Sequence, residues 1–338
     1  MIIDIPDMNF YNALEFCDKL NQIVPVEGEK YYFDFANVYT CDPFPMLIVS
    51  NEIRNKRKEL ERFECYAKNC NNTYARHMKF YNACGIEKND DVSVSKGNTR
   101  YNCITKLSVQ QLKNEGLNDL DIIQEVIDKK SKLMAEILAQ GNKGFQSWLS
   151  FVIREIMRNV PEHSNSDTIW YCAQYWPSYD LVELAILDEG IGIRKSLSDN
   201  IAYHNQIDSD LDAIQLALKP GISGTFRGDS QPITNNEWDN SGYGLYMVSQ
   251  MCAELDASFI VASGDAAIRI RKEESSIVQE CKKTKVHGTA IQIRIKPSHT
   301  TDYDKIRRII LQRGEMQAKG MQGSIHVASK SSRGYDIY

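Results

Sequence analysis

Hydrophobic residues recur at two different periods along this chain, and together the two periods predict a protein built of helices and strands. Apolar positions at helical spacing cover 120–138 and 148–156. Apolar or alternating runs at 31–35, 181–187 and 290–295 are typical of strands. Because the two kinds of element are interspersed, we expect an α+β fold.

The region 1–110 is predicted to form a small α/β domain. Expected strands at 31–35 and 63–67 enclose an expected helix at 45–57, and 73–84 favours another helix. Strands that alternate with helices in this way are typical of α/β packing.

The sequence predicts three further segments after this domain. A long amphipathic connector helix is expected at 111–141, where it can pack on the next domain or pair with its copy in a homodimer. A second domain is expected at 142–300. The segment 301–338 is expected to hold a helix and then a flexible tail rich in Gly, Ser and Lys.

Three short boxes in the second domain carry the candidate chemistry. They read REIMRNVPEHS at 154–164, LDEGIGI at 187–193 and NSGYGLYMVSQM at 240–251. In the first box, Glu155 and Asn159 are four residues apart and share one face of a helix. A carboxylate and an amide placed so can serve Mg²⁺ and an attacking water. A solvated polar face is the alternative interpretation.

The other two boxes combine glycines with the end of a strand or the start of a helix. Asp188 follows an apolar strand, where its carboxylate can accept a hydrogen bond from an exocyclic amine. Gly190 and Gly192 let the backbone approach a flat ligand closely. Gly242 and Gly244 precede a helical stripe, and a helix N-terminus favours phosphate. Ordinary turns would explain either box alone.

In this order, and with Gly288-Thr289 ahead of the strand at 290–295, the boxes resemble those of the GHKL ATPase superfamily, which includes gyrase and histidine kinases. The resemblance covers 142–296 and implies a Bergerat fold, a two-layer α/β sandwich whose mixed sheet is backed by helices. It also implies ATP and Mg²⁺ as ligands. Neither a P-loop pattern nor a G-x-G-x-x-G fingerprint occurs in the sequence.

The resemblance implies a role for each matched residue. Glu155 would be the catalytic group that orients or deprotonates the nucleophile, and Asn159 would hold Mg²⁺. The residues expected to contact the nucleotide are Asn159, His163, Asp188, Gly190, Gly192, Gly221, Gly242, Gly244, Leu245 and Thr289. Among them Asp188 would read the adenine amine with support from Thr289.

Two features refine this assignment. Pro161 lies inside the first box, so the helix is expected to kink or end there, downstream of Asn159. The long segment 194–239 is expected to be the ATP lid, in which Lys219 or Arg227 could add positive charge near the phosphates.

The N-terminal region resembles a STAS-like domain, the fold of anti-sigma-factor antagonists. The residues that carry this resemblance are YYFDFANV at 31–38, CDPFPMLIV at 41–49 and YARHMKFYNACGI at 74–86. That family often has a phosphorylatable Ser or Thr after its second strand, where this chain has Cys-Asp-Pro-Phe-Pro. A generic α/β packing domain is the alternative.

Bulk properties narrow the class of protein. The 338 residues allow two domains, and the net charge of −5 without a long basic block makes nucleic acid an unlikely partner. No apolar run approaches the roughly 20 residues of a membrane span. Nine cysteines without a secretory signal indicate reduced thiols and a cytoplasmic protein.

The sequence leaves three possible functions open. The chain could be a regulatory ATPase switch, an anti-sigma-type serine/threonine protein kinase acting on a STAS-like partner, or a nucleotide-binding interaction module without turnover. No histidine lies between His77 and His163, so the connector helix carries no phosphoacceptor histidine. We expect a bacterial signalling protein with a protein partner, or a homodimer formed through the N-terminal domain or the connector.

Overall fold

An antiparallel sheet lies at the centre of the molecule. The computed structural model describes residues 1–87, 92, 97–98, 100–119, 122–224, 241–274, 276–299 and 302–333. In spatial order the strands are β4 (Gly97–Asn98), β5 (Tyr101–Ser108), β6 (Thr168–Trp176), β7 (Leu181–Asp188), β9 (Ser276–Ile295) and β8 (Ser258–Glu273). Every neighbouring pair is antiparallel.

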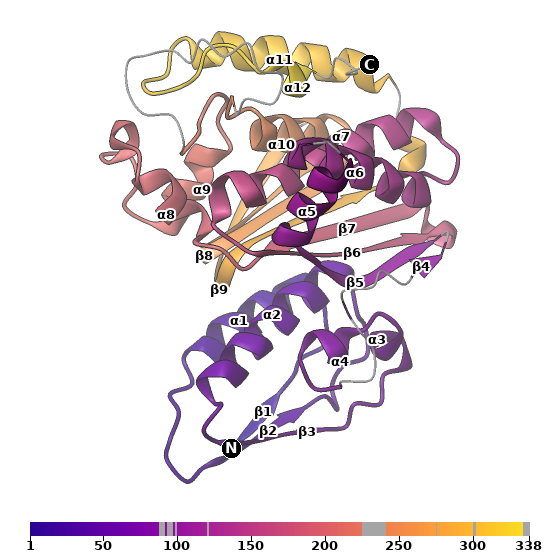
Figure 1. Ribbon diagram of the computed structural model, residues 1–338, viewed down its shortest axis with the longest axis vertical. Helices are drawn as coiled ribbons and strands as arrows, with labels where there is room; N and C mark the ends of the chain where they lie inside the picture. Colours follow the sequence, from indigo (N-terminus) through magenta and orange to yellow (C-terminus); the bar gives the residue numbers. More distant parts are fainter. Residues whose placement is uncertain are drawn as a thin grey trace.

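Helices from the middle and the end of the chain cover one face of this sheet. They are α5 (Val109–Asp119), α6 (Ile123–Ala139), α7 (Lys143–Asn159) and α10 (Gly244–Glu254), with α11 (Tyr303–Ala318) outside α10 (Figure 1). The apolar stripe of α7 supplies Trp148 and Leu149 to the core, where they join Ile186 of β7 and Ile293 of β9. The helical period of this segment therefore buries one continuous side of the helix against the sheet.

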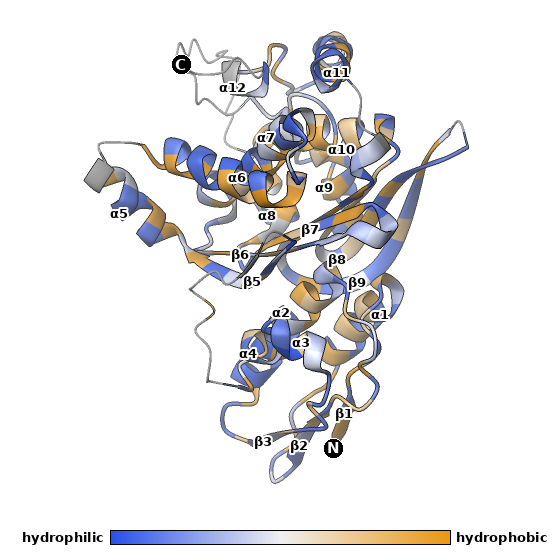
Figure 2. Ribbon diagram, turned by 90° about the vertical axis from the view of Figure 1, so that its right-hand side faces the viewer, coloured by the Kyte–Doolittle hydropathy of each residue, from blue (hydrophilic) through white to orange (hydrophobic). Residues whose placement is uncertain are grey.

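The N-terminal region covers the opposite face. Helices α1 (Phe10–Asn21) and α2 (Pro43–Glu59) lie between the large sheet and a small parallel sheet of β1 (Ile2–Asp4), β2 (Lys30–Asp34) and β3 (Glu64–Lys68) (Figure 1). Figure 2 shows the large sheet with α7 and α10 on one side and α1 and α2 on the other. Phe44 and Ile48 of α2 share one hydrophobic cluster with Trp170, Ala185 and Ala290 of the large sheet.

The shorter helices lie at the edges of these layers. They are α3 (Thr73–His77) and α4 (Phe80–Ala83) beside α2, α8 (Gly192–Ser198) and α9 (Asp210–Ala217) near the ends of β7 and β8, and α12 (Lys330–Arg333). Within the described residues, none of the helices combines the length and the apolar character that crossing a bilayer requires.

The predicted α+β class is confirmed, but the predicted mixed sheet is wrong. Every neighbouring strand pair of the large sheet is antiparallel. Strands β6 and β7, for example, are joined by a short turn at Pro177–Tyr179 that reverses the chain.

Two segments differ from the predicted boundaries. The connector holds two helices, α5 and α6, rather than one helix over 111–141. Strand β5, which was grouped with the N-terminal domain, pairs with β6 in the large sheet. Its neighbour in space is distant in sequence, and local periodicity does not reveal such a pairing.

Phe44→Ala tests whether the N-terminal layer and the large sheet share one core. Phe44 is completely buried, so the cavity should cost about 3–5 kcal/mol in the free energy of unfolding. Far-UV and near-UV denaturation curves should shift together as a single transition.

The matched control is Tyr39→Ala, because the Tyr39 side chain is 75% exposed and its loss should cost less than about 0.5 kcal/mol. Two separate transitions, of which Phe44→Ala shifts only one, would show that the layers unfold independently.

Candidate functional site

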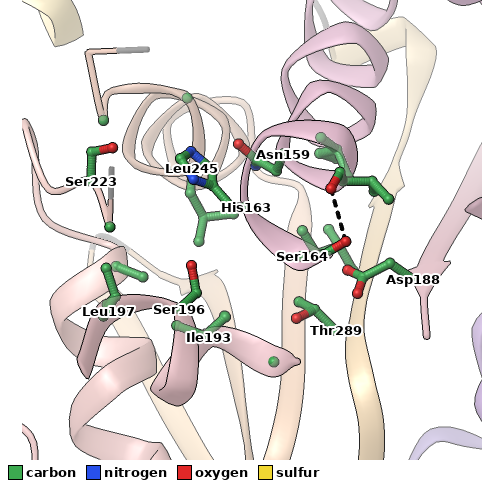
Figure 3. Close-up of a pocket in the computed structure, with 18 of the residues that line it drawn as sticks. Asn159, His163, Ser164, Asp188, Ile193, Ser196, Leu197, Ser223, Leu245 and Thr289 are labelled. Atoms are coloured by element: carbon green, nitrogen blue, oxygen red, sulfur yellow. Dashed lines mark hydrogen bonds between the residues drawn. The ribbon is translucent and has the colours of Figure 1, made fainter. Parts of the chain in front are cut away.

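The end of α7 forms the first wall of a cavity. The helix ends at Asn159, and the chain continues as a π-helical turn over Val160–Ser164. The α-helix thus ends two residues before Pro161, whose ring nitrogen has no hydrogen to donate. The Ser164 hydroxyl donates to the Val160 carbonyl oxygen at 2.9 Å and closes the turn (Figure 3). The turn places His163 and Asn159 at the cavity.

The end of β7 places a buried carboxyl beside this turn. Asp188 is 7% exposed, and its Oδ1 accepts a hydrogen bond from the Gly190 amide at 2.8 Å. Burial raises the pKa of Asp188 to about 7, while hydrogen bonds from Gly190, Ser164 and Thr289 act in the opposite direction. Near neutral pH this carboxyl can therefore exchange between a hydrogen-bond donor and an acceptor.

Backbones approach very closely where β7 ends against the interior of β9. Asp188, the last residue of β7, pairs with Thr289 in the sheet register. Gly288 has φ +86°, and a Cβ there would lie 1.8 Å from the Asp188 carbonyl oxygen. Ser263 of β8 links this part of β9 to the second box, because its hydroxyl donates to the Gly288 carbonyl at 2.8 Å and accepts from the Ile193 amide at 3.0 Å.

The third box forms the remaining wall. Gly242 has φ +68°, and a Cβ there would lie 2.4 Å from the Ile222 carbonyl oxygen. Gly244 is the first residue of α10, followed by Leu245. The first amides of a helix have no partners within the helix, so this end of α10 offers N–H groups and positive potential.

One cavity collects most of the predicted residues, although they come from distant parts of the chain (Figure 3). The predicted residues that line it are Asn159, His163, Asp188, Gly192, Gly242, Gly244, Leu245 and Thr289. The remaining lining is mostly apolar or small: Ile156, Val160, Ser164, Ile186, Ile193, Ser196, Leu197, Ala217, Ile222, Ser223, Gly224 and Ile291. The cavity therefore has an apolar wall, a buried carboxyl and a helix N-terminus.

The apolar wall was missed at the sequence level, although part of it could have been found. Ile186 precedes Asp188 by two residues and Ile291 follows Thr289 by two. Residues two apart in a strand face the same side of the sheet. Strand alternation therefore identifies both isoleucines once Asp188 and Thr289 are taken as site residues.

Two predicted glycines lie outside the cavity lining and have structural roles. A Cβ on Gly190 would lie 2.1 Å from the Ser164 carbonyl oxygen, so this glycine permits the close packing of the second box on the π-helical turn. Gly221 has φ +76°, and its amide donates to the Gly242 carbonyl oxygen at 3.1 Å. This hydrogen bond holds the backbone of the third box at Gly242.

Glu155 also lies outside this cavity. Its carboxylate is 3.2 Å from the Arg154 guanidinium and 3.9 Å from that of Arg158. It lines a smaller neighbouring pocket, which shares Asn159, Gly242 and Gly244 with the cavity. The predicted catalytic carboxylate is thus close to the α10 N-terminus but separate from Asp188.

Cation binding at this site would rely on few protein ligands. Asn159 lines the cavity, whereas Lys219 is exposed and Arg227 lies outside the described residues. Over the described ranges, no cluster of three or more His, Cys, Asp or Glu side chains is arranged to hold a metal ion. Mg²⁺ keeps several waters and uses few protein oxygens, so Asn159 with phosphate oxygens fits its chemistry.

From outside the cavity, helix α2 contacts the residue after β7 and a residue of β9 next to Gly288, a feature that no sequence motif indicated. Arg54 forms a 3.0 Å ion pair with Glu189, the residue after Asp188. The completely buried Glu52 accepts from the His287 amide at 2.9 Å and contacts His287 Nδ1 at 2.7 Å. The hydrogen bond with Glu52 raises the pKa of His287.

Comparison with known proteins adds no assignment, since no protein-family model and no curated protein matches the chain. The three chemical parts of the cavity, the apolar wall, the buried carboxyl and the helix N-terminus, suit a ligand that is flat and apolar at one end and anionic at the other.

Asp188→Asn tests the titration of the buried carboxyl. The folded pKa lies above the ordinary value, so the native state holds a proton that the unfolded chain releases, and stability falls as pH rises through about 4 to 7. Asparagine cannot ionise. The melting temperature of Asp188→Asn relative to the parent should therefore rise by roughly 5 °C between about pH 5 and about pH 8.

The exposed Asp199→Asn is the matched control, and its relative melting temperature should not change over this range. A constant difference for Asp188→Asn as well would contradict the raised pKa.

Gly288→Ala tests the close approach of β7 and β9. The methyl group would collide with the Asp188 carbonyl, so we expect a loss of at least roughly 3 kcal/mol in unfolding free energy, or no folded protein. Gly141→Ala is the control, because Gly141 has the same φ of +86° but nothing within 4 Å of its Cβ position. It should cost only about 1–2 kcal/mol of backbone strain. Equal losses in denaturant titrations would argue against the collision.

Proposed function

We propose that the chain is a Mg²⁺-dependent ATP-binding protein of the GHKL type that acts as a regulatory ATPase switch. The observation that carries this proposal is that residues of all three sequence boxes line one cavity together with Thr289. Each box has a composition suited to nucleotide chemistry, and a shared ligand requires that they converge.

The base would occupy the end of the cavity at β7 and β9. Asp188 and Thr289 are neighbours there, and Ile186 and Ile291 provide apolar surface. In its ionised form the Asp188 carboxylate accepts a hydrogen bond from the exocyclic amine of adenine. Gly192, with φ +76°, lets the backbone lie close to the ring.

The phosphates would extend towards α10. Gly242, Gly244 and Leu245 bring the helix N-terminus to the cavity, and Asn159 lies beside it. Asn159 would hold Mg²⁺ through its side-chain oxygen, and the ion would supply positive charge to compensate the phosphates. The backbone amides of the third box would bind phosphate.

The switch would act through the elements around the cavity. Segment 194–224 packs over it, and α2 holds Glu189 and His287 next to it. A nucleotide that shifts the segments around Glu189 and His287 would therefore change how α2 and the N-terminal, STAS-like layer pack on the large sheet. Such a layer suits contact with a protein partner or a second copy of the chain.

A specific observation also favours a second candidate, an interaction module that binds nucleotide without turnover. Glu155 is held by Arg154 and Arg158 and lies in the neighbouring pocket. The carboxylate therefore lies outside the cavity that would hold the nucleotide. Turnover would require the Glu155 side chain to turn from Arg154 towards that cavity.

Titration of the full chain with Mg·ATP tests the proposed site. Asp188→Asn should weaken binding about 10- to 100-fold, because it removes a hydrogen bond to a charged acceptor. Asn159→Ala should abolish the Mg²⁺ dependence of binding. Asp199→Asn and Asn205→Ala, which change the same residue types at exposed positions, should bind as the parent does. Unchanged affinity in both cavity variants would reject the assignment.

Phosphate release separates the two candidates. In a regulatory ATPase, Glu155→Gln should leave binding intact and reduce release about 10²- to 10⁴-fold. Binding without release by the parent protein would instead identify the interaction module, or a kinase that needs an acceptor.

A further inference from the structure

The C-terminal segment after α11 is fastened to the elements around the cavity. The Tyr203 hydroxyl donates to the Gly323 carbonyl oxygen at 2.8 Å, and the Tyr243 hydroxyl donates to the Ile325 carbonyl oxygen at 3.1 Å. The Ile325 amide donates to the Gly221 carbonyl oxygen at 2.8 Å. The segment is thereby held on the backbone that supports the third box.

Further along, this C-terminal segment carries two serines that form, together with Ser241, a chain of three hydroxyl groups beside the α10 N-terminus. The Ser241 hydroxyl donates to Ser329 Oγ at 3.2 Å, and Ser329 Oγ donates to Ser332 Oγ at 3.2 Å. Arg333 keeps this turn in place through a 2.8 Å ion pair with Glu315 of α11. Ser241 directly precedes Gly242, so the hydroxyl chain begins at the phosphate end of the proposed nucleotide site.

The hydroxyl groups share a pocket with the predicted catalytic carboxylate. Ser329 and Ser332 line the small pocket that contains Glu155 and Arg158. Asn159, Gly242 and Gly244 line both this pocket and the proposed nucleotide cavity. An acceptor hydroxyl, a carboxylate and a phosphate-binding helix end thus meet at one boundary, which is the set of groups that phosphoryl transfer uses.

We propose that Ser329 is a phosphorylation site of this chain, and that its own nucleotide site supplies the phosphoryl group within the same molecule. The inference rests on the proposed function, because a nucleoside triphosphate must occupy the cavity. Ser329 is favoured over Ser332 because it bonds directly to Ser241 and is partly exposed, whereas Ser332 is 3% exposed.

Phosphoryl transfer to Ser329 needs only the serine hydroxyl, the Glu155 carboxylate and the bound nucleoside triphosphate. Ser329 Oγ forms a bond to the γ-phosphorus as the bond between that phosphorus and the β,γ-bridging oxygen breaks. The hydroxyl proton passes to the Glu155 carboxylate, and the nucleoside diphosphate leaves with the bridging oxygen. Arg158, in the same pocket, can then pair with the phosphoserine dianion, as arginines do with phosphate.

Mass spectrometry of the full chain after incubation with Mg·ATP tests this proposal. We expect an increase of about 80 Da that maps to Ser329. Ser329→Ala should lose the modification and retain ATP binding, which also shows that the variant is folded. Glu155→Gln should likewise bind ATP but slow the modification about 10²-fold or more.

Ser324→Ala is the matched control on the same segment. Its hydroxyl donates to the carbonyls of Ala318 and Met321 and does not line the pocket. This variant should be modified as fast as the parent. The observed rate constant should not change when the protein is diluted, because the transfer occurs within one molecule.

The outcomes separate this inference from the proposed function. Absence of ATP binding would reject the proposed function and this inference with it. ATP binding without phosphoserine, or with phosphate on another residue, would overturn only the assignment of Ser329. A rate constant that falls on dilution would overturn transfer within the molecule.

Discussion

The contact between the end of β7 and the interior of β9 determines the geometry of the candidate site. Gly288 carries no Cβ, so its backbone can lie against the Asp188 carbonyl, where a Cβ would be only 1.8 Å away. That approach sets the sheet register that places Thr289 opposite Asp188. The carboxyl of Asp188 then meets the π-helical turn after α7, and Gly190 allows the turn to pack there. A side chain at either glycine would separate the walls of the cavity.

The same contact explains how the N-terminal layer is joined to the site. Glu52 of α2 is buried and binds both the amide and the ring of His287, the residue before Gly288. Arg54, two residues further along α2, pairs with Glu189 and lies 3.9 Å from the centre of the Trp170 ring. One short stretch of helix therefore contacts both the residue after β7 and the residue before Gly288. Glu52 is buried and the Arg54–Glu189 pair is mostly buried, so separation would leave polar groups without their partners. Movement of α2 and of these two segments should consequently be linked.

Sequence predicted the parts of the site whose chemistry is local. Glycines before a helix, a carboxylate at a strand end and a helix stopped by Pro161 each show in a few consecutive residues, and the structure places most of them at one cavity. The pairing of β5 with β6 and the contacts of Glu52 with His287 join residues that are far apart in sequence. Such contacts depend on how complete elements pack, so no local period signals them. The sequence also placed Glu155 with Asn159 correctly on one helix, but it could not show the Arg154 and Arg158 contacts that hold the carboxylate away from the cavity.

The position of Glu155 gives the two compartments different electrostatics. The cavity holds a carboxyl whose pKa is raised to about 7 by burial, so it can be neutral when the site is empty. The neighbouring pocket contains a carboxylate beside two guanidinium groups, together with the hydroxyl chain of Ser329. Gly242 and Gly244 separate the two, and the α10 N-terminus adds positive potential at that boundary. An anionic group at that boundary would meet Arg158, whose guanidinium lies 3.1 Å from Glu162 and 3.9 Å from Glu155. The Arg154 contact with Glu155, at 3.2 Å, does not involve Arg158. Glu155 would therefore stay paired with Arg154 even if an anion drew Arg158 away.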